Sequence, residues 1–191
     1  YPGRKIFANV SANVESDKRL VVIGPNGSGK STLIRIICRL IRPTKGKIEL
    51  SLDDKIIKDI EIRNYIGLVS PDLVLYDELS AIENLSFFSQ VAGYSLTKME
   101  IKDKLEFIGL SGRGDDLVGS YSSGMKQRLK YCLALSRNPD VLLLDEPTAN
   151  LDDAGKEIVD SIIKSHNGIA VIATNEKNEW SYGDQILRLG A

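Results

Sequence analysis

A short stretch near the start of the chain combines residue types that suit phosphate binding. The motif G-x-x-x-x-G-K-[ST] is matched by Gly24-Pro25-Asn26-Gly27-Ser28-Gly29-Lys30-Ser31, and Thr32 follows. Glycines let backbone N–H groups turn toward phosphate oxygens, Lys30 supplies a compact positive charge, and Ser31 supplies a hydroxyl for Mg²⁺. A helix that starts here adds free N–H donors. The sequence therefore predicts a nucleotide-binding loop, but this motif alone does not separate a kinase, a GTPase and an ATPase.

Two acidic residues follow an apolar run in the second half of the chain. The run 141–144 is Val-Leu-Leu-Leu, and Asp145, Glu146 and Pro147 come directly after it. A carboxylate at a strand end beside a phosphate loop is where Mg²⁺ needs a ligand, so we assign that role to Asp145. Glu146 lies where a base could meet an attacking water. The alternative is an acidic turn after a strand.

The elements that position these residues alternate between strands and helices. Apolar runs predict strands at 20–23, 48–52, 65–69, 141–144, 169–173 and 186–189. Helical spacing predicts helices from Ser31 up to Pro43 and at 78–93, 99–108, 122–135 and 154–165. This alternation indicates a largely parallel sheet covered on both faces. No strand is predicted between residues 72 and 137. We therefore expect residues 72–137 to form a helical subdomain, inserted between 1–71 and 138–191, which are the two parts of a core lobe.

Composition limits the other possibilities. The chain has 191 residues and a formal net charge of −1, which argues against a mainly electrostatic nucleic-acid binder. No apolar run exceeds five residues, so the sequence predicts no membrane-spanning segment. Cys38 and Cys132 lie in apolar segments, which predicts buried, reduced thiols.

At this point the chain resembles a family, the ATP-binding cassette (ABC) ATPases. Residues 121–128, Tyr-Ser-Ser-Gly-Met-Lys-Gln-Arg, resemble its signature, usually Leu-Ser-Gly-Gly-Gln. Residues 145–152, Asp-Glu-Pro-Thr-Ala-Asn-Leu-Asp, resemble its Walker B and D-loop run. The resemblance covers nearly the whole chain. It implies an α/β fold: a P-loop NTPase core with a mainly parallel sheet, a small antiparallel β region at the N-terminus and a helical subdomain inserted in the middle.

The resemblance also implies a mechanism with ATP and Mg²⁺. Two cassettes pair head to tail, and each ATP lies between the phosphate loop of one and the signature of the other. Ser122 and Gly124 face the γ-phosphate in trans, and Asp152 lines the dimer interface. Tyr1 stacks on adenine. Two simpler interpretations remain open, a plain helix cap for Ser122 and a disordered terminus for Tyr1.

Three departures from the family pattern bear on activity. Pro71 stands where the family has a glutamine, and Asn175 stands where it has a histidine. The signature is loose, because Tyr121, Ser123 and Met125 replace Leu, Gly and Gln. Asn175 can donate a hydrogen bond to phosphate but cannot become cationic. We therefore expect ATP hydrolysis that depends on Glu146 and is slowed by Asn175.

The resemblance favours an ATP-hydrolysing subunit of an ABC transporter. The expected partners are a second copy of the chain, as a homodimer, and a transmembrane permease subunit, with no nucleic acid. The expected location is cytoplasmic, peripheral on the inner face of the cell membrane. Within the family, the chain more weakly resembles the small cassettes of the haem-export and cytochrome c maturation type. The alternative is a soluble ABC ATPase for iron–sulfur assembly or for nucleic-acid or scaffold work. The chain is also expected to lack residues that precede Tyr1 in the family.

Overall fold

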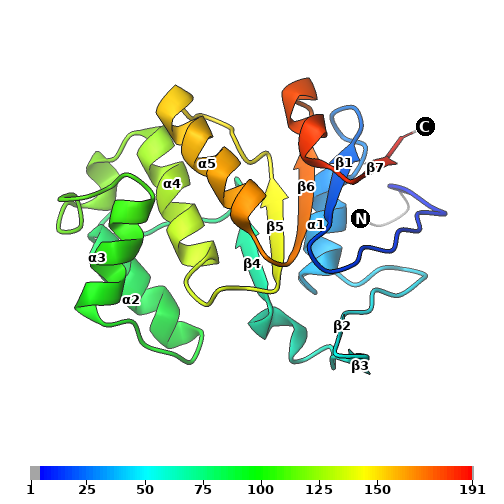
Figure 1. Cartoon of the computed structure of the whole chain (residues 1–191), viewed down its shortest axis with the longest axis horizontal. Coiled ribbons are helices and arrows are strands. Elements are labelled where there is room, and N and C mark those ends of the chain that lie inside the picture. Colours follow the sequence, from blue (N-terminus) through cyan, green and yellow to red (C-terminus); the bar gives the residue numbers. More distant parts are fainter. Residues whose placement is uncertain (1–4, 191) are drawn as a thin grey trace. The chain divides into compact units, whose positions relative to one another are not determined.

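A five-stranded sheet is the main feature of the computed structural model, which describes residues 5–190 (Figure 1). The strand order is β4-β5-β6-β1-β7, and the pairs β5–β6, β6–β1 and β1–β7 are parallel. The strands are β1 (Arg19–Ile23), β4 (Ile66–Val69), β5 (Val141–Asp145), β6 (Ile169–Thr174) and β7 (Gln185–Arg188). The expected α/β fold with a mainly parallel sheet is confirmed.

The apolar runs become strands because the middle of the sheet is buried. Every residue of β5 is buried, as are all but the first residues of β1 and β6. Such strands carry apolar side chains on both faces, which explains continuous runs without polar alternation. Helix α1 (Lys30–Ile37) contributes Leu33 and Ile34 to the core, where they join Val22, Leu143 and Val171.

The chain divides into two compact units. Unit 1 comprises 1–68, 139–147 and 166–191, and unit 2 comprises 69–138 and 148–165. In unit 2, α2 (Ala81–Val91), α3 (Lys98–Phe107) and α4 (Ser123–Ala134) pack against one another (Figure 1). Unit 2 also contains α5 (Asp153–Ser165), a helix that the sequence analysis placed in the core lobe. The boundaries of unit 2 therefore differ from the expected helical subdomain 72–137. Residues 5–190 also contain three short 3₁₀ helices, η1 (Ile62–Asn64), η2 (Val118–Ser120) and η3 (Lys177–Tyr182).

The predicted helix from Ser31 to Pro43 is shorter than expected. Helix α1 ends at Ile37, and Arg39 adopts a left-handed conformation with φ of 60°. The N–H groups of Leu40 and Ile41 then turn back to the carbonyl of Arg35. This closes the helix before Pro43 is reached, in the way a left-handed residue ends many helices.

The small antiparallel sheet consists of β2 (Ser51–Leu52) and β3 (Lys55–Ile56). It lies within the first third of the chain, and residues 48–50, which the sequence analysis included in a strand, are outside it. Asp53 and Asp54 both have positive φ and form the turn between the two strands. Aspartate tolerates this conformation better than most residues, so it suits a tight hairpin.

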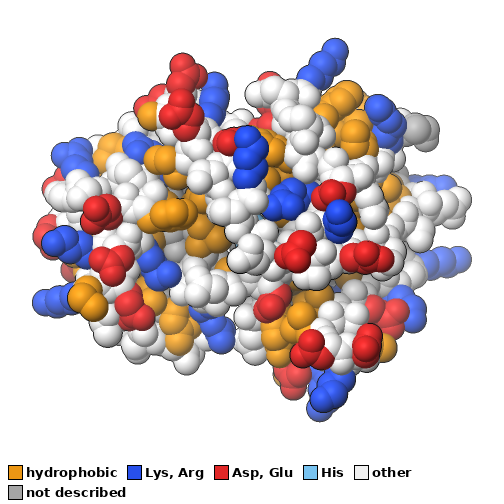
Figure 2. Space-filling model, viewed as in Figure 1, with side chains coloured by type: hydrophobic (Ala, Val, Ile, Leu, Met, Phe, Trp, Pro, Cys, Tyr) orange, Lys and Arg blue, Asp and Glu red, His pale blue; other side chains and the backbone are white. Residues whose placement is uncertain are grey.

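Two further expectations concern the cysteines and membrane spans. Cys38 and Cys132 are buried and free, and burial raises the pKa of each thiol to about 12, so the expectation of buried thiols is confirmed. Among the described residues, no helix has the length and apolar character needed to cross a bilayer. On the face drawn in Figure 2, basic and acidic side chains are interspersed.

Asn84 organises the loop that precedes α2. Its side chain is fully buried, and its Oδ1 accepts a hydrogen bond from the Tyr76 N–H at 2.9 Å. Its Nδ2 donates to the carbonyls of Tyr76, at 3.0 Å, and Ser80, at 3.0 Å. One side chain therefore satisfies backbone groups that would otherwise be buried without partners.

We predict that Asn84→Ala lowers the free energy of unfolding by about 2–3 kcal/mol, because it leaves buried backbone groups unpaired. Urea denaturation measures the change. Gln90→Ala is the matched control on the exposed side of the same helix and is expected to have little effect. Equal stability of the Asn84 variant and the control would contradict the assigned role.

Candidate nucleotide-binding site

The register of the parallel strands brings the predicted site residues of unit 1 to one edge of the sheet. Ile23, the last residue of β1, pairs with Thr174, and Asp145, the last residue of β5, pairs with Ala173. The segments that begin at Gly24, Glu146 and Asn175 therefore leave the sheet side by side. This edge is where open parallel sheets bind ligands.

The phosphate loop depends on glycine at two positions. A Cβ on Gly24 would lie 2.5 Å from the Leu189 carbonyl oxygen, so only glycine allows this close approach. Gly29 precedes α1 with φ of 101°, and a Cβ there would lie 2.6 Å from Ile6. Glycine is therefore required both where the loop leaves β1 and where it enters α1.

Lys30 lies inside the loop. Its side chain is buried, and Nζ donates to the Gly24 carbonyl at 2.9 Å and to Asn175 Oδ1 at 2.7 Å. Asn175 Nδ2 in turn donates to Asn26 Oδ1 and, at 3.4 Å, to Glu146 Oε1. One asparagine thus connects the loop lysine, the loop itself and the acidic strand end.

Glu146 has an unusual backbone. Its φ is 53°, a conformation that is strained for a residue other than glycine, and its N–H donates to the Ala173 carbonyl at 2.9 Å. Strain of this kind persists where the surrounding structure holds it, often at functional sites. Burial raises the pKa of the Glu146 carboxyl, Asp145 and Glu179 raise it further, and Lys30 opposes them. A raised pKa suits a carboxylate that accepts a proton.

A cavity of about 370 Å³ brings part of the loop and Glu146 together. Its lining includes Asn26, Gly27, Gly29, Lys30, Ser31, Thr32 and Glu146. Lys5, Ile6 and Arg35 also line it, and sequence reasoning missed them because no motif includes these positions. Pro25 is exposed, and Ser28 and Asp145 are buried next to lining residues. Tyr1, the expected adenine contact, lies outside the described residues.

The signature-like segment lies in unit 2. Ser122 caps α4, because its Oγ accepts a hydrogen bond from the Met125 N–H at 3.2 Å. A Cβ on Gly124 would lie 3.0 Å from the Asn150 carbonyl oxygen, so a larger residue would press on the segment before α5. Asp152 Oδ1 accepts from the Gly155 N–H at 2.9 Å. Ser122 and Asp152 are exposed, and both also have a local capping role.

Lys130 anchors the loop that carries Pro71. Its Nζ donates to the carbonyls of Ser70 and Pro71, both at 3.1 Å. Burial lowers the pKa of the Lys130 ammonium, and the nearby Asp72 opposes that shift. One turn earlier on α4, Lys126 forms an ion pair with Asp77 at 2.7 Å. Two lysines of the helix that begins at the signature therefore hold both ends of this loop.

A sequence model described as ABC transporter matches residues 7–149. The chain belongs to the ABC transporter family. It is 33% identical over 84% of its length to the ABC transporter ATP-binding protein NatA of Bacillus subtilis (strain 168), of which it covers 66%. It is 34% identical over 93% of its length to the cell division ATP-binding protein FtsE of the same organism, of which it covers 82%.

Solved structures of this family resemble the chain over nearly its whole length. An ATP-binding subunit of an ABC transporter has a TM-score of 0.85 and 25% identity, with 99% of this chain and 81% of that chain covered. A dimeric, post-hydrolysis ATP-binding cassette bound to ADP and Pi has a TM-score of 0.81 and 27% identity, with 96% and 86% covered. The chain spans less than two thirds of several curated relatives, including 60% of the bacitracin transport protein BcrA of Bacillus licheniformis. None of the relatives named here is a haem exporter, so that narrower resemblance is not confirmed.

We predict that the Glu146 carboxyl titrates above its ordinary pKa of 4.5, and that Lys30→Met raises this pKa further by removing an opposing charge. Side-chain ¹³C NMR, assigned with Glu146→Gln, measures both values. The folded state holds this proton more tightly than the unfolded chain does, so ionised Glu146 costs stability above the folded pKa. Glu146→Gln is therefore expected to be at least as stable as the wild type at pH 7. A pKa at or below 4.5 would contradict this account.

Proposed function

We propose that the chain is the ATP-binding and ATP-hydrolysing subunit of an ABC transporter, and that it pairs head to tail with a second copy to drive a membrane permease. The observation that carries this proposal is the cavity where loop residues and Glu146 meet. Family membership directs the proposal to ATP, and the relatives named above include transport proteins. No observation favours a soluble cassette for iron–sulfur assembly or nucleic-acid work.

The loop residues provide what a triphosphate needs. Lys30 is a positive charge among backbone carbonyls, and it can exchange its contact with Gly24 for phosphate oxygens. Helix α1 begins at this lysine, and its first three residues line the same cavity. The N–H groups of a first helical turn favour an anion. These groups contact phosphate only, so they do not select one nucleoside triphosphate over another.

Ser31 and Asp145 fit a magnesium ion. Ser31 lines the cavity with a hydroxyl, and Asp145 is a buried carboxylate at the same end of the sheet, where β6 separates β5 from β1. Mg²⁺ prefers oxygen ligands and usually combines one or two protein oxygens with substrate phosphates and waters. When bound, the ion would neutralise charge on the β- and γ-phosphates while the γ-phosphoryl group is transferred to water.

Glu146 is the proposed general base, and Asn175 positions it. The carboxylate accepts the proton of the attacking water, and its raised pKa makes that acceptance more favourable. Asn175 donates to Glu146 Oε1 and accepts from Lys30, so it holds the base near the loop. An asparagine is neutral, so it stabilises the developing phosphate charge less than a cation does. We therefore expect slow hydrolysis.

The second copy supplies the rest of the site. Ser122 and Ser123 are exposed at the start of α4, where N–H groups favour an anion. The related cassette bound to ADP and Pi is a dimer, which supports a paired arrangement. A permease that contacts the loop after β4 would also affect α4, because Lys130 of α4 is hydrogen-bonded to that loop. This link supports coupling between the permease and the nucleotide site despite Pro71. The same function places the subunit at the cytoplasmic side of a membrane.

We predict that Glu146→Gln yields an ATP-bound dimer, because it removes the base while leaving phosphate contacts intact. Gel filtration with light scattering in Mg-ATP measures the mass, with Mg-ADP as the control nucleotide. A second control is Glu146→Gln combined with Lys30→Met, which is expected to remain monomeric. A Glu146→Gln variant that stays monomeric in Mg-ATP would contradict the paired site.

We predict that Asn175→His increases ATP turnover, since histidine keeps a hydrogen bond to phosphate and can also carry charge. Steady-state phosphate release is the measurement. Adding Glu146→Gln to the histidine variant is expected to abolish the gain, which ties the rate to this base. A large fall in turnover for Asn175→His alone would show that asparagine is the better residue here.

A further inference from the structure

Unit 1 contains another cavity, separate from the one at the phosphate loop. It has a volume of about 920 Å³ and is lined by the segment after α1 and by the segment from β3 to η1. We call it the basic groove and define it by Arg39, Arg42, Lys47, Lys58 and Arg63 together with Glu49, Asp59 and five isoleucines. It shares no lining residue with the cavity that contains Lys30.

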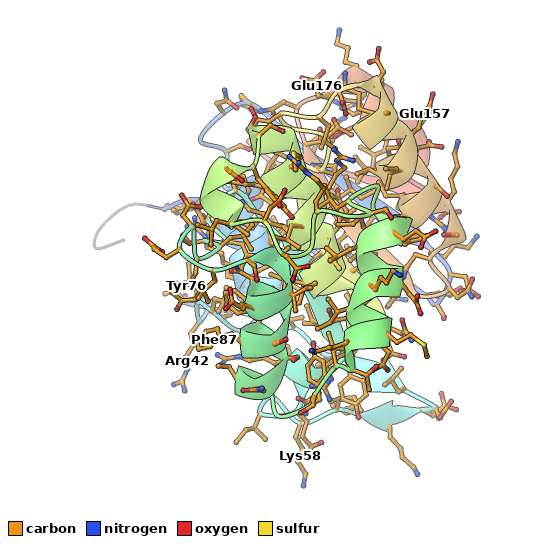
Figure 3. The ribbon with its side chains drawn as sticks, turned by 90° about the vertical axis from the view of Figure 1, so that its left-hand side faces the viewer. Arg42, Lys58, Tyr76, Phe87, Glu157 and Glu176 are labelled. Carbon is orange, nitrogen blue, oxygen red and sulfur yellow. The ribbon has the colours of Figure 1, made fainter. Side chains whose placement is uncertain are left out.

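The basic groove carries an excess of positive charge. Both of its acids are already in ion pairs, Asp59 with Arg39 at 2.8 Å and Glu49 with Lys47 at 2.8 Å. Arg42 and Lys58 are exposed and take part in no ion pair within residues 5–190. In Figure 3 both side chains extend outward from the ribbon. Arg63 is exposed and also takes part in no ion pair within residues 5–190, so the groove offers three cationic groups, while the whole chain has a net charge of −1.

Arg39 connects the two segments that line this groove. Its Nη2 donates to the Ile48 carbonyl and to Asp59, and Arg63 donates to the Arg39 carbonyl at 3.1 Å. Arg39 Nε is buried and has no hydrogen-bond partner among the described residues. A buried donor without a partner is costly.

The basic groove also carries exposed apolar side chains. Ile56 is 67% exposed and Ile60 is 86% exposed, and both line the same groove as Arg42 and Lys58. Exposed apolar side chains that gather beside unpaired charges are typical of interaction sites. An occupant that satisfies both features must carry carboxylates and apolar groups together.

We propose that the basic groove binds an acidic peptide segment of a partner protein, in which carboxylates contact Arg42 and Lys58 and apolar side chains cover Ile56 and Ile60. The volume is close to the upper end of ligand pockets, which suits several side chains rather than one small anion. An anionic bilayer fits less well, because the site is concave and also contains Glu49 and Asp59. This binding does not depend on nucleotide binding or hydrolysis.

A labelled peptide tests the proposal on the intact chain. The probe is a short fluorescein-labelled peptide with alternating Glu and Leu, and fluorescence anisotropy measures its affinity. Its control replaces every Glu with Gln. We expect the acidic peptide to bind at least about ten-fold more tightly than the Gln peptide, and a Glu-only peptide to bind more weakly because it leaves the isoleucines uncovered.

Charge-reversal variants locate the binding. Arg42→Glu with Lys58→Glu is expected to weaken acidic-peptide binding by at least about ten-fold. The matched control is Lys98→Glu with Lys102→Glu, two exposed lysines of α3 that lie outside the groove, and it should bind like the wild type. Retained ATP binding and an unchanged melting temperature show that each variant is folded. Ile60→Ser should weaken binding without a change in charge.

Three results would overturn the proposal. These are equal affinity for the Glu and Gln peptides, equal loss of binding in both charge-reversal variants, and no binding of the acidic peptide. Vesicles of phosphatidylcholine with phosphatidylserine provide the remaining comparison. Vesicle binding that depends on Arg42 and Lys58, together with weak peptide binding, would assign the groove to a membrane surface instead.

Discussion

The parallel register of β1, β5 and β6 is the constraint on which the nucleotide site depends. Because Ile23 pairs with Thr174 and Asp145 pairs with Ala173, three distant segments leave the sheet at one edge. A slip of one residue in a strand would turn its side chains to the opposite face and move its end along the edge. Every residue of β5 is buried, so such a slip would disrupt close packing on both faces of this strand and lower the stability of the fold. Packing of the core therefore fixes the site geometry.

Polar contacts then hold these segments in place. Asn175 lies between Lys30, Asn26 and Glu146, and Glu146 itself is tied to β6 through its backbone N–H. The strained backbone conformation of Glu146 persists because this hydrogen bond to β6 and the buried strand β5, which directly precedes Glu146, hold it in place. Burial at this position raises its pKa, so one arrangement supplies both the position and the basicity of the proposed general base.

Unit 2 uses a different device, in which single polar side chains organise loops. Asn84 satisfies the backbone ahead of α2, and Lys130 holds the turn that contains Pro71. Lys130 attaches this loop to α4, at whose start Ser122 and Gly124 lie. This attachment does not depend on the side chain at position 71, because Lys130 contacts backbone carbonyls.

The sequence by itself determined the phosphate loop, the acidic strand end, the fold class and most elements, because these follow from local motifs and from the spacing of apolar residues. Only the tertiary structure decided that Asn175 meets both Lys30 and Glu146, that Lys5 and Ile6 line the cavity, and that α1 ends before Arg39. It also created the basic groove from separate segments. The physical reason is that periodicity reports which face of an element is buried, whereas contacts between distant segments depend on strand order, register and backbone conformations that no short pattern encodes.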